Sequence, residues 1–389
     1  MGRIYVDNAA TSWPKPETVY SAIDHYMREC GAPAGRSAYT DAVDAARSVD
    51  HARKLTAKLL GVSDPHRVAF SLNGTDALNM AIHGIVQPND HVVTTEVEHN
   101  SVLRPLRFVE DSRGVEVTRV PCDSKGYIDP GDINAAIRTN TKLVAITHAS
   151  NVTGMIQPIE EIGVIVRRHG GLLLVDAAQS AGHLSIEVDD VVVDLLAAPG
   201  HKGLLGPLGT GLLIVGDRAA SIISSIRQGG TGTHSQDDRH PATLPDQLEA
   251  GNLNVTGVVG LAAGIEFLLE KGVAEIRQHE LTLTAQLLNG LQQIDGVTIY
   301  GPTPSEPRVG VVSISITDYD AQEVAAALDS GYGIQTRSGF HCAPLIHKRL
   351  GTEPFGGTVR FSVGPFNTEQ DIQAILSAVQ QIASMSVEV

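Results

Sequence analysis

The sequence predicts an α/β protein built on a mostly parallel central sheet, and three observations lead to this prediction. The chain of 389 residues is long enough for two or three domains with a substantial core. From about residue 15 to residue 260, short apolar runs alternate with longer amphipathic stretches, as in stacked βα units. The runs themselves are largely apolar on successive residues, which is typical of strands that are covered on both faces.

Six of these runs are predicted strands, at residues 68–71, 91–95, 143–147, 172–175, 194–197 and 211–215. A long apolar-faced helix is predicted at residues 257–271, and the pattern changes after it. The later part reads as a strand at 311–316, a helix near 322–330 and a final helix from residue 368 onward. We therefore expect a large domain over residues 15–265, and a smaller α+β domain formed by residues 1–14 together with 266–389.

Composition excludes several kinds of protein. A formal net charge of −15 would repel a nucleic-acid backbone, so we expect no nucleic-acid partner. No apolar run approaches the roughly 18 residues of a membrane helix, and residues 1–7 lack the apolar core of a secretion signal. The three cysteines are too few for a disulfide framework and form no CxxC pair. We expect a cytoplasmic protein with no membrane partner and no metal site.

Polar residues follow each predicted strand, where ligands gather in open parallel sheets. Gly74 and Thr75 open a helix whose free N–H groups could hold a phosphate, although an ordinary capped turn would have the same residues. His99 could stack on a planar cofactor and carry protons, and it could equally be a structural histidine. Asn151 could bind a ring hydroxyl or a substrate carboxylate, or be a simple turn residue.

The next two strands end in an acid and a lysine. Asp176 closes one strand, with Gln179 just beyond it, and His201 and Lys202 follow the next. Pyridoxal phosphate needs a carboxylate for its pyridinium nitrogen and an amine for its aldehyde. Five strand ends thus carry groups that suit one cofactor, and we expect pyridoxal 5′-phosphate at this edge of the sheet.

A second group of reactive residues lies in the predicted small domain. Cys342 stands in the segment 337–345, directly after His341 and five residues after Arg337, and a nearby cation raises the thiolate fraction of a cysteine. A buried, inert cysteine is the other reading of this segment. Arg360 offers a planar fork that could bind a carboxylate bidentately, or form an ordinary surface ion pair.

Seven segments of the chain, taken in order, resemble the motifs of one family. They are residues 5–11, 98–99, 150–151, 176–179, 200–202, 249–251 and 337–343. These motifs are similar to those of the cysteine desulfurases with the class V aminotransferase fold, and closest to the Suf-type group. The resemblance covers nearly the whole chain and implies a pyridoxal-phosphate enzyme of fold type I.

The resemblance also implies a role for each matching residue. Lys202 would attach the cofactor, Asp176 would pair with its ring nitrogen, His99 would stack on the ring, and Gln179 would lie beside the ring hydroxyl. Gly74, Thr75, His201 and Asn252 would lie at the phosphate, and Ala9, Asn151, Arg337 and Arg360 at the substrate. Cys342 would accept the sulfur. A homodimer is implied too, in which the loop at residues 249–254 reaches the partner's cofactor.

Two positions depart from the family pattern at the phosphate. Pro199 stands where relatives commonly have Ser or Thr, and Asn252 stands where they have Thr. Pro199 has no hydroxyl, whereas Asn252 can still donate a hydrogen bond. Because one charge-assisted hydrogen bond contributes roughly 1.5 to 3 kcal/mol, we expect weaker cofactor retention but not its loss.

The function predicted from the sequence is a cysteine desulfurase that converts L-cysteine to L-alanine and receives the sulfur on Cys342 as a persulfide. A protein or a small thiol would then accept the sulfur, as in iron–sulfur cluster assembly. Another class V pyridoxal enzyme, such as a C–S lyase, a selenocysteine lyase or an aminotransferase, stays an alternative in which Cys342 has no covalent role. A weakly catalytic subunit of a sulfur-transfer assembly is the second alternative.

Overall fold

The structure, a computed structural model, describes residues 3–35, 37–233 and 236–386. Within these residues seven strands form one central sheet, in the order β2–β8–β7–β6–β5–β3–β4. All neighbouring pairs are parallel except the two that involve β8, which runs antiparallel to β2 and β7. The predicted α/β class with a mostly parallel sheet is therefore confirmed.

The central sheet and the helices around it follow one another along the chain. The strands are β2 (Val68–Ser71), β3 (His91–Thr95), β4 (Glu116–Val120), β5 (Thr141–Thr147), β6 (Leu172–Asp176), β7 (Leu195–Pro199) and β8 (Gly211–Val215). The helices are α1 (Glu17–His25), α2 (Thr40–Leu59), α3 (Gly74–Ile85), α4 (Asn100–Arg113), α5 (Pro130–Ala136), α6 (Ile159–Arg168), α7 (Asp217–Ala220), α8 (Val255–Lys271) and α9 (Val273–Leu291).

The two faces of this sheet bury separate apolar clusters, because successive side chains of a strand point to opposite faces. In β6, Leu173 and Val175 belong to one cluster, which includes residues of α2 and α8. Leu172 and Leu174 belong to the other, which includes residues of α3 and α4. This double covering explains why β6 is apolar on consecutive residues and stood out in the sequence.

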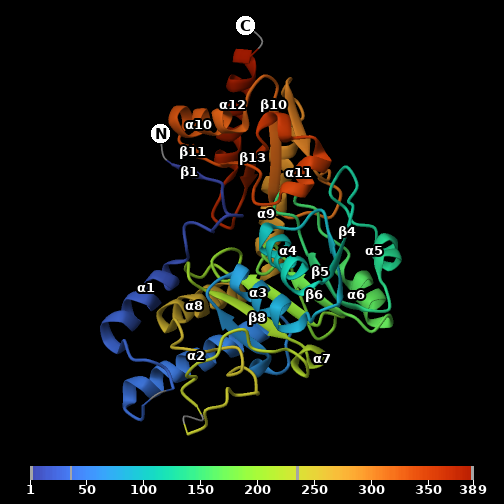
Figure 1. Cartoon of the computed structure of the whole chain (residues 1–389). Helices are drawn as coiled ribbons and strands as arrows, with labels where there is room; N and C mark the ends of the chain where they lie inside the picture. The colour runs from blue at the N-terminus through green and yellow to red at the C-terminus, as the bar shows by residue number, and fades with distance from the viewer. Residues whose placement is uncertain (1–2, 36, 234–235, 387–389) are drawn as a thin grey trace.

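The C-terminal part builds around a second sheet, drawn orange and red at the top of Figure 1. In the described residues this sheet has four antiparallel strands in the order β12 (Arg337–Gly339), β13 (Thr358–Ser362), β10 (Val311–Ile316) and β9 (Val297–Tyr300). Helices α10 (Ala321–Tyr332), α11 (Pro344–Leu350) and α12 (Glu369–Ser386) accompany it. Its apolar cluster includes residues of α9, α10 and α12, and also Val6.

The beginning of the chain joins this C-terminal part. Strand β1 (Ile4–Tyr5) pairs in parallel with β11 (Ile334–Gln335), and the two lie side by side in Figure 1. Asp7 forms a further bridge to Ser362, which brings the residues after β1 to the end of β13. The boundaries predicted at residues 14/15 and 265/266 remain a prediction.

The predicted strands and helices agree with the structure to within two residues at each end, and β7 spans Leu195–Pro199 where residues 194–197 were predicted. Strand β4 was not predicted. Its sequence Glu-Val-Thr-Arg-Val contains three polar residues, because β4 is an edge strand and is only partly buried. Among the described residues, no helix has both the length and the apolar character to cross a membrane.

Candidate active site

A cavity lies at the carboxyl ends of the central strands. Eight residues predicted for the site line it together: Gly74, Thr75, His99, Asn151, Asp176, Gln179, His201 and Lys202. The turns after β2, β3, β5, β6 and β7 supply these side chains. The sheet edge therefore brings together residues that are up to 128 positions apart, from Gly74 to Lys202.

Asp176 and Lys202 form the charged centre of this cavity. Asp176 is the last residue of β6, is almost fully buried, and accepts a 2.9 Å hydrogen bond from the Ala178 N–H. Burial raises the pKa of the Asp176 carboxyl, and the Ala178 N–H and Lys202 oppose this rise. Burial also lowers the pKa of Lys202 to about 8, despite the opposing charge of Asp176. The Lys202 amine is thus available in its nucleophilic neutral form near neutral pH.

His99 is fixed by the start of helix α4, where it is the N-cap residue. Its Nδ1 accepts a 3.0 Å hydrogen bond from the Ser101 N–H, so the neutral ring carries its proton on Nε2. Burial, followed by the charge of Lys202, lowers the pKa of His99 to about 4. The ring that faces the cavity is therefore an uncharged imidazole at neutral pH.

The predicted phosphate-binding turn opens helix α3. The Asn73 side chain caps the helix by accepting from the Asp76 N–H, while Gly74 and Thr75 form its first turn beside the cavity. A Cβ on Gly74 would lie 3.1 Å from Cδ of Pro199, so the proline ring packs directly against this turn. Pro199 therefore lies against the turn that the sequence predicts to bind a phosphate.

Gln179 and Asn151 link the cavity to other parts of the chain. Gln179 Nε2 donates to the Ala9 carbonyl at 3.0 Å, so Ala9 reaches the site through its backbone. Asn151 Nδ2 donates to the His341 backbone carbonyl at 2.7 Å. The backbone carbonyl of Asn151 accepts from Arg360 Nη1 at 3.1 Å. Asn151 thus joins the cavity wall to the segment that carries the cysteine.

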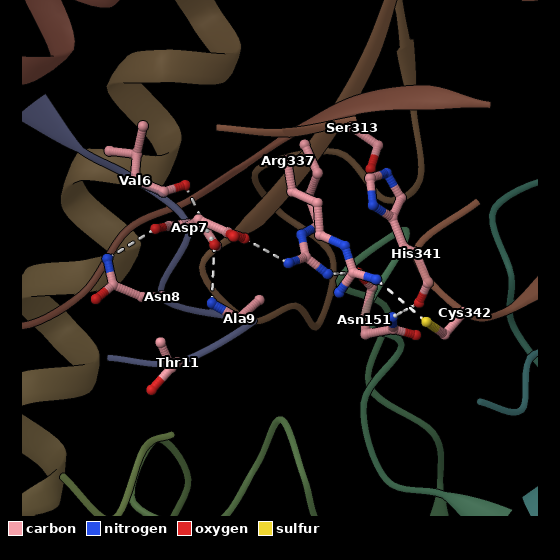
Figure 2. Close-up of polar contacts among 12 residues, drawn as sticks. Val6, Asp7, Asn8, Ala9, Thr11, Asn151, Ser313, Arg337, His341 and Cys342 are labelled. Atoms are coloured by element: carbon pink, nitrogen blue, oxygen red, sulfur yellow. Dashed lines mark hydrogen bonds and ion pairs between the residues drawn. The ribbon is translucent and has the colours of Figure 1, made fainter. Parts of the chain in front are cut away.

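Cys342 lies at a groove that adjoins the cavity. The groove shares Thr75, His99 and Ser101 with the cavity, and Cys342 is among its lining residues. Arg337 Nη2 donates a 3.1 Å hydrogen bond to Cys342 Sγ, as Figure 2 shows. The Cys342 carbonyl accepts from the Asn100 N–H at 2.7 Å, which fixes the cysteine against the start of α4.

Arg360 is fully buried in the middle of β13 and forms an ion pair, but not at the surface. Its Nη2 donates to Asp7 Oδ1 at 2.7 Å. Its Nε is buried and has no hydrogen-bond partner among the described residues. The strand partner of Arg360 in β12 is Arg337, which places the two arginines side by side.

Ala9, Arg337, Cys342 and Arg360 are not among the residues that line the cavity, and neither is Asn252. It is exposed and lines a different pocket, together with Asp76, Thr210 and Glu249. This position neither supports nor contradicts the predicted contact with a partner subunit.

Three residues near the site were not singled out from the sequence. The Ser101 hydroxyl forms hydrogen bonds with Thr75 Oγ1 at 2.7 Å and with His99 Nδ1 at 2.9 Å, so it links the first turn of α3 to the histidine. Glu98 is fully buried behind His99, and Asp7 pairs with Arg360. Ser101 could have been suspected from its place in the first turn of a helix, whereas the contact of Asp7 spans 353 residues and left no local pattern.

The donor set of the cavity fits pyridoxal phosphate. Lys202 and Asp176 supply the amine and the carboxylate, and the first turn of α3 supplies free N–H groups. Nδ1 of His201, which lines the cavity, is buried without a partner among the described residues. Among all the residues that the structure describes, no group of three or more His, Cys, Asp or Glu side chains could hold a metal ion.

Comparison with known proteins agrees with this arrangement. Residues 4–375 match the family model described as aminotransferase class-V. A probable cysteine desulfurase of Methanothermobacter thermautotrophicus is 38% identical, with 98% of this chain and 95% of the relative covered. A probable cysteine desulfurase of Halalkalibacterium halodurans is 34% identical over 97% of this chain and 92% of its own.

Solved structures show the same similarity. The apo structure of a cysteine desulfurase from Thermococcus onnurineus superposes with a TM-score of 0.92 at 33% identity, covering 98% of this chain and 95% of that one. The cysteine desulfurase CsdA from Escherichia coli, in an S-sulfonic acid form, gives a TM-score of 0.88 at 26% identity, with the same coverage of both chains. The chain therefore belongs to the class V aminotransferase family, with the pyridoxal-phosphate fold type I, and is related over nearly its whole length to that family's cysteine desulfurases.

Proposed function

We propose that this protein is a pyridoxal-phosphate-dependent cysteine desulfurase that converts L-cysteine to L-alanine and takes the sulfur onto Cys342 as a persulfide. One observation carries the proposal: Cys342, with Arg337 at its sulfur, lines a groove continuous with the cavity that holds Lys202 and Asp176. A pyridoxal site alone would fit many reactions, whereas a cysteine at its entrance suits sulfur transfer.

The residues that would hold the cofactor are those of the cavity. Lys202 would attach its aldehyde, Asp176 would pair with its ring nitrogen, and His99 would stack on the ring with Gln179 beside the hydroxyl. Gly74, Thr75 and His201 would bind its phosphate. When bound, the cofactor supplies an electron sink that makes the substrate Cα–H acidic and the Cβ–S bond breakable.

The chain's own groups then bind the substrate and move its protons. Arg360 and Asn151 would hold the substrate carboxylate, with Arg360 offering its unpartnered Nε–H. Lys202 is the base for the Cα proton, because burial lowers its pKa to about 8 and leaves part of the amine neutral. His99 stays uncharged beside it, since burial lowers its pKa to about 4.

Cys342 acts as the nucleophile toward the substrate sulfur. Its thiolate attacks that sulfur, a new S–S bond forms, and the Cβ–S bond breaks with its electron pair left on the carbon fragment. A proton then completes the methyl group of alanine. Arg337 Nη2, 3.1 Å from Cys342 Sγ, can stabilise the negative charge on the thiolate and later on the persulfide.

A sulfur acceptor and a second subunit complete the proposal. A protein or a small thiol would take the sulfur from Cys342, and the protein would act as a homodimer in which Asn252 reaches the partner's cofactor phosphate. The exposed position of Asn252, away from its own cavity, is compatible with such a contact. Assignment to the Suf-type group remains a prediction from the sequence motifs.

The direct test is turnover of L-cysteine by the protein loaded with pyridoxal phosphate. We expect equal amounts of alanine and of sulfur, the latter released by a reducing thiol. The Cys342→Ala variant should lose most of this turnover while it still binds the cofactor. Undiminished production of alanine and persulfide by the variant would favour another class V reaction, in which the cysteine has no covalent role.

A further inference from the structure

Asp7 forms the counter-ion of Arg360, and the proposed reaction gives it no role. Arg360 Nη2 and Asp7 Oδ1 are 2.7 Å apart, the Arg360 side chain has no exposed surface, and that of Asp7 is 19% exposed. Figure 2 shows Asp7 between the segment around Ala9 and the arginine side chains. The group expected to bind the substrate carboxylate is therefore already paired with a carboxylate of the chain.

Both partners of this ion pair are fixed by the fold. The Asp7 carbonyl accepts from the Ala10 N–H at 3.0 Å and from the Tyr5 hydroxyl at 3.2 Å, which holds the turn that carries Asp7. Arg360 lies on β13 between strands β10 and β12, and its Nη1 donates to the Asn151 carbonyl. Each partner is thus held by contacts that do not involve the Asp7 carboxylate, so a neutral side chain at position 7 tests the charge of that carboxylate.

The charges around Arg360 come from several elements. Arg337 on β12 and Lys202 after β7 carry basic groups, while Asp7 and Asp176 carry carboxyl groups and Cys342 carries a thiol. His99 and His341 also face this region, and burial lowers the pKa of both rings below the neutral range. Asp7 is the carboxylate in direct contact with Arg360.

We propose that Asp7 sets the affinity of the site for the substrate carboxylate by neutralising Arg360. A buried guanidinium without an anion is strongly disfavoured, so Asp7 stabilises the protein when no substrate is present. A second carboxylate on the same guanidinium meets the repulsion of Asp7 and binds less tightly. Because alanine has the same carboxylate as cysteine, this weaker binding also promotes product release. The role given to Arg360 rests on the proposed function.

The test compares two ligands that differ only at the carboxylate. L-alanine and L-alaninamide are titrated into the protein loaded with pyridoxal phosphate, and binding is followed by the absorbance of the bound cofactor. For Asp7→Asn we expect the Kd of L-alanine to fall by about tenfold, since one nearby charge contributes roughly 1.4 kcal/mol. The Kd of L-alaninamide should change less than about threefold, because the amide has no charge to be repelled.

Further variants separate the charge from the fold. Asp7→Glu keeps the carboxylate and should bind L-alanine like the unsubstituted protein. Its KM and kcat for L-cysteine should both equal those of the unsubstituted protein. Asp7→Asn should lower KM and also lower kcat, because alanine leaves more slowly. If Asp7→Asn does not fold, Asp7→Ser provides the same neutral test. An unchanged or weaker affinity for L-alanine in a folded neutral variant contradicts the proposal.

A measurement without cofactor makes the two proposals independent. Iodoacetate and iodoacetamide alkylate the same thiol, but only iodoacetate is an anion, so the ratio of their rates at Cys342 reports the local charge. In cofactor-free protein this ratio should rise in Asp7→Asn. A raised ratio, together with no turnover of L-cysteine by the unsubstituted protein, would contradict the proposed function but support the proposed role of Asp7. Normal turnover, together with an unchanged ratio and an unchanged Kd, would support the proposed function but contradict the role of Asp7.

Discussion

The chemistry of single residues in this site is set by burial more than by neighbouring charge. Burial lowers the pKa of Lys202 to about 8 although both Asp176 and Asp7 act to raise it. The same cause lowers the pKa of His201 to about 4. The cavity therefore holds the uncharged imidazoles of His99 and His201 beside a lysine whose amine is partly neutral near pH 8, an arrangement suited to a proton carrier and an amine nucleophile.

The pKa of Lys202 predicts how fast the cofactor attaches. Cofactor-free protein should take up pyridoxal phosphate faster as the pH rises, with half of the maximal rate near pH 8, because only the neutral amine reacts. The measurement is the change in absorbance on mixing at a series of pH values. Lys202→Ala, which keeps the cavity but lacks the amine, should show no such phase. A rate that is flat from about pH 7 to pH 9 would contradict the assigned pKa.

In the turn between β3 and α4, the buried Glu98 side chain precedes His99 and helps to hold the turn in place. Glu98 Oε1 accepts from the Thr95 hydroxyl at 2.6 Å and from the Thr147 N–H at 3.1 Å, while its Oε2 has no partner among the described residues. Burial raises the pKa of Glu98 to about 8, with a further rise from nearby Asp176. The carboxyl is thus protonated at neutral pH and ties β3 to β5 just before His99.

Replacing Glu98 with Gln should make the protein less sensitive to pH. Because the folded pKa of about 8 lies above the value of 4.5 for a free carboxyl, folding binds a proton and stability falls as pH rises between these values. Glu98→Gln has no such proton, so its free energy of unfolding should not show this fall. The difference between the variant and the unsubstituted protein should therefore shift in favour of the variant from about pH 5 to pH 8. Denaturant titrations at both pH values measure this. An identical pH dependence in the two proteins would mean that Glu98 is ionised when folded.

How much of each element could be predicted depends on whether its cause is local. Strand β6 and the residues after it were predicted because a doubly covered strand is apolar throughout and its end is marked by Asp176. Strand β4 was missed because its partly buried edge position allows three polar residues among five and leaves no apolar run. Ser101 and Glu98 were missed because their contacts cross between turns that only the folded sheet brings together.

On the scale of the whole molecule, long-range contacts join segments that the sequence left separate. Asp7 reaches Arg360 across 353 positions, and Arg53 on α2 reaches Glu249 across 196. Arg53 donates from both Nη1 and Nη2 to the Glu249 carboxylate, at 2.8 and 2.9 Å, and Glu249 also accepts from the Phe70 N–H. This buried fork fixes the start of the loop that carries Asn252.

The buried ion pair between Arg53 and Glu249 should contribute far more to the free energy of unfolding than an exposed ion pair on the same helix. Arg53→Met should lower the free energy of unfolding by roughly 3 kcal/mol or more, because it leaves the Glu249 carboxylate buried without its cation. The matched control is Arg47→Met, since Arg47 pairs with Asp44 on α2 with both side chains more than half exposed. That change should cost less than about 0.5 kcal/mol. Similar losses in both variants would show that the fork adds nothing beyond a surface pair.

The central claim is that sulfur from L-cysteine becomes bound to Cys342. The most direct measurement is the mass of the peptide that contains Cys342, alkylated and analysed after the protein loaded with pyridoxal phosphate is mixed with L-cysteine. We predict that this peptide gains one sulfur atom in step with the alanine formed, and that the peptides with Cys30 and Cys122 gain none. Alanine formation at full rate with no added sulfur on Cys342 would contradict the account.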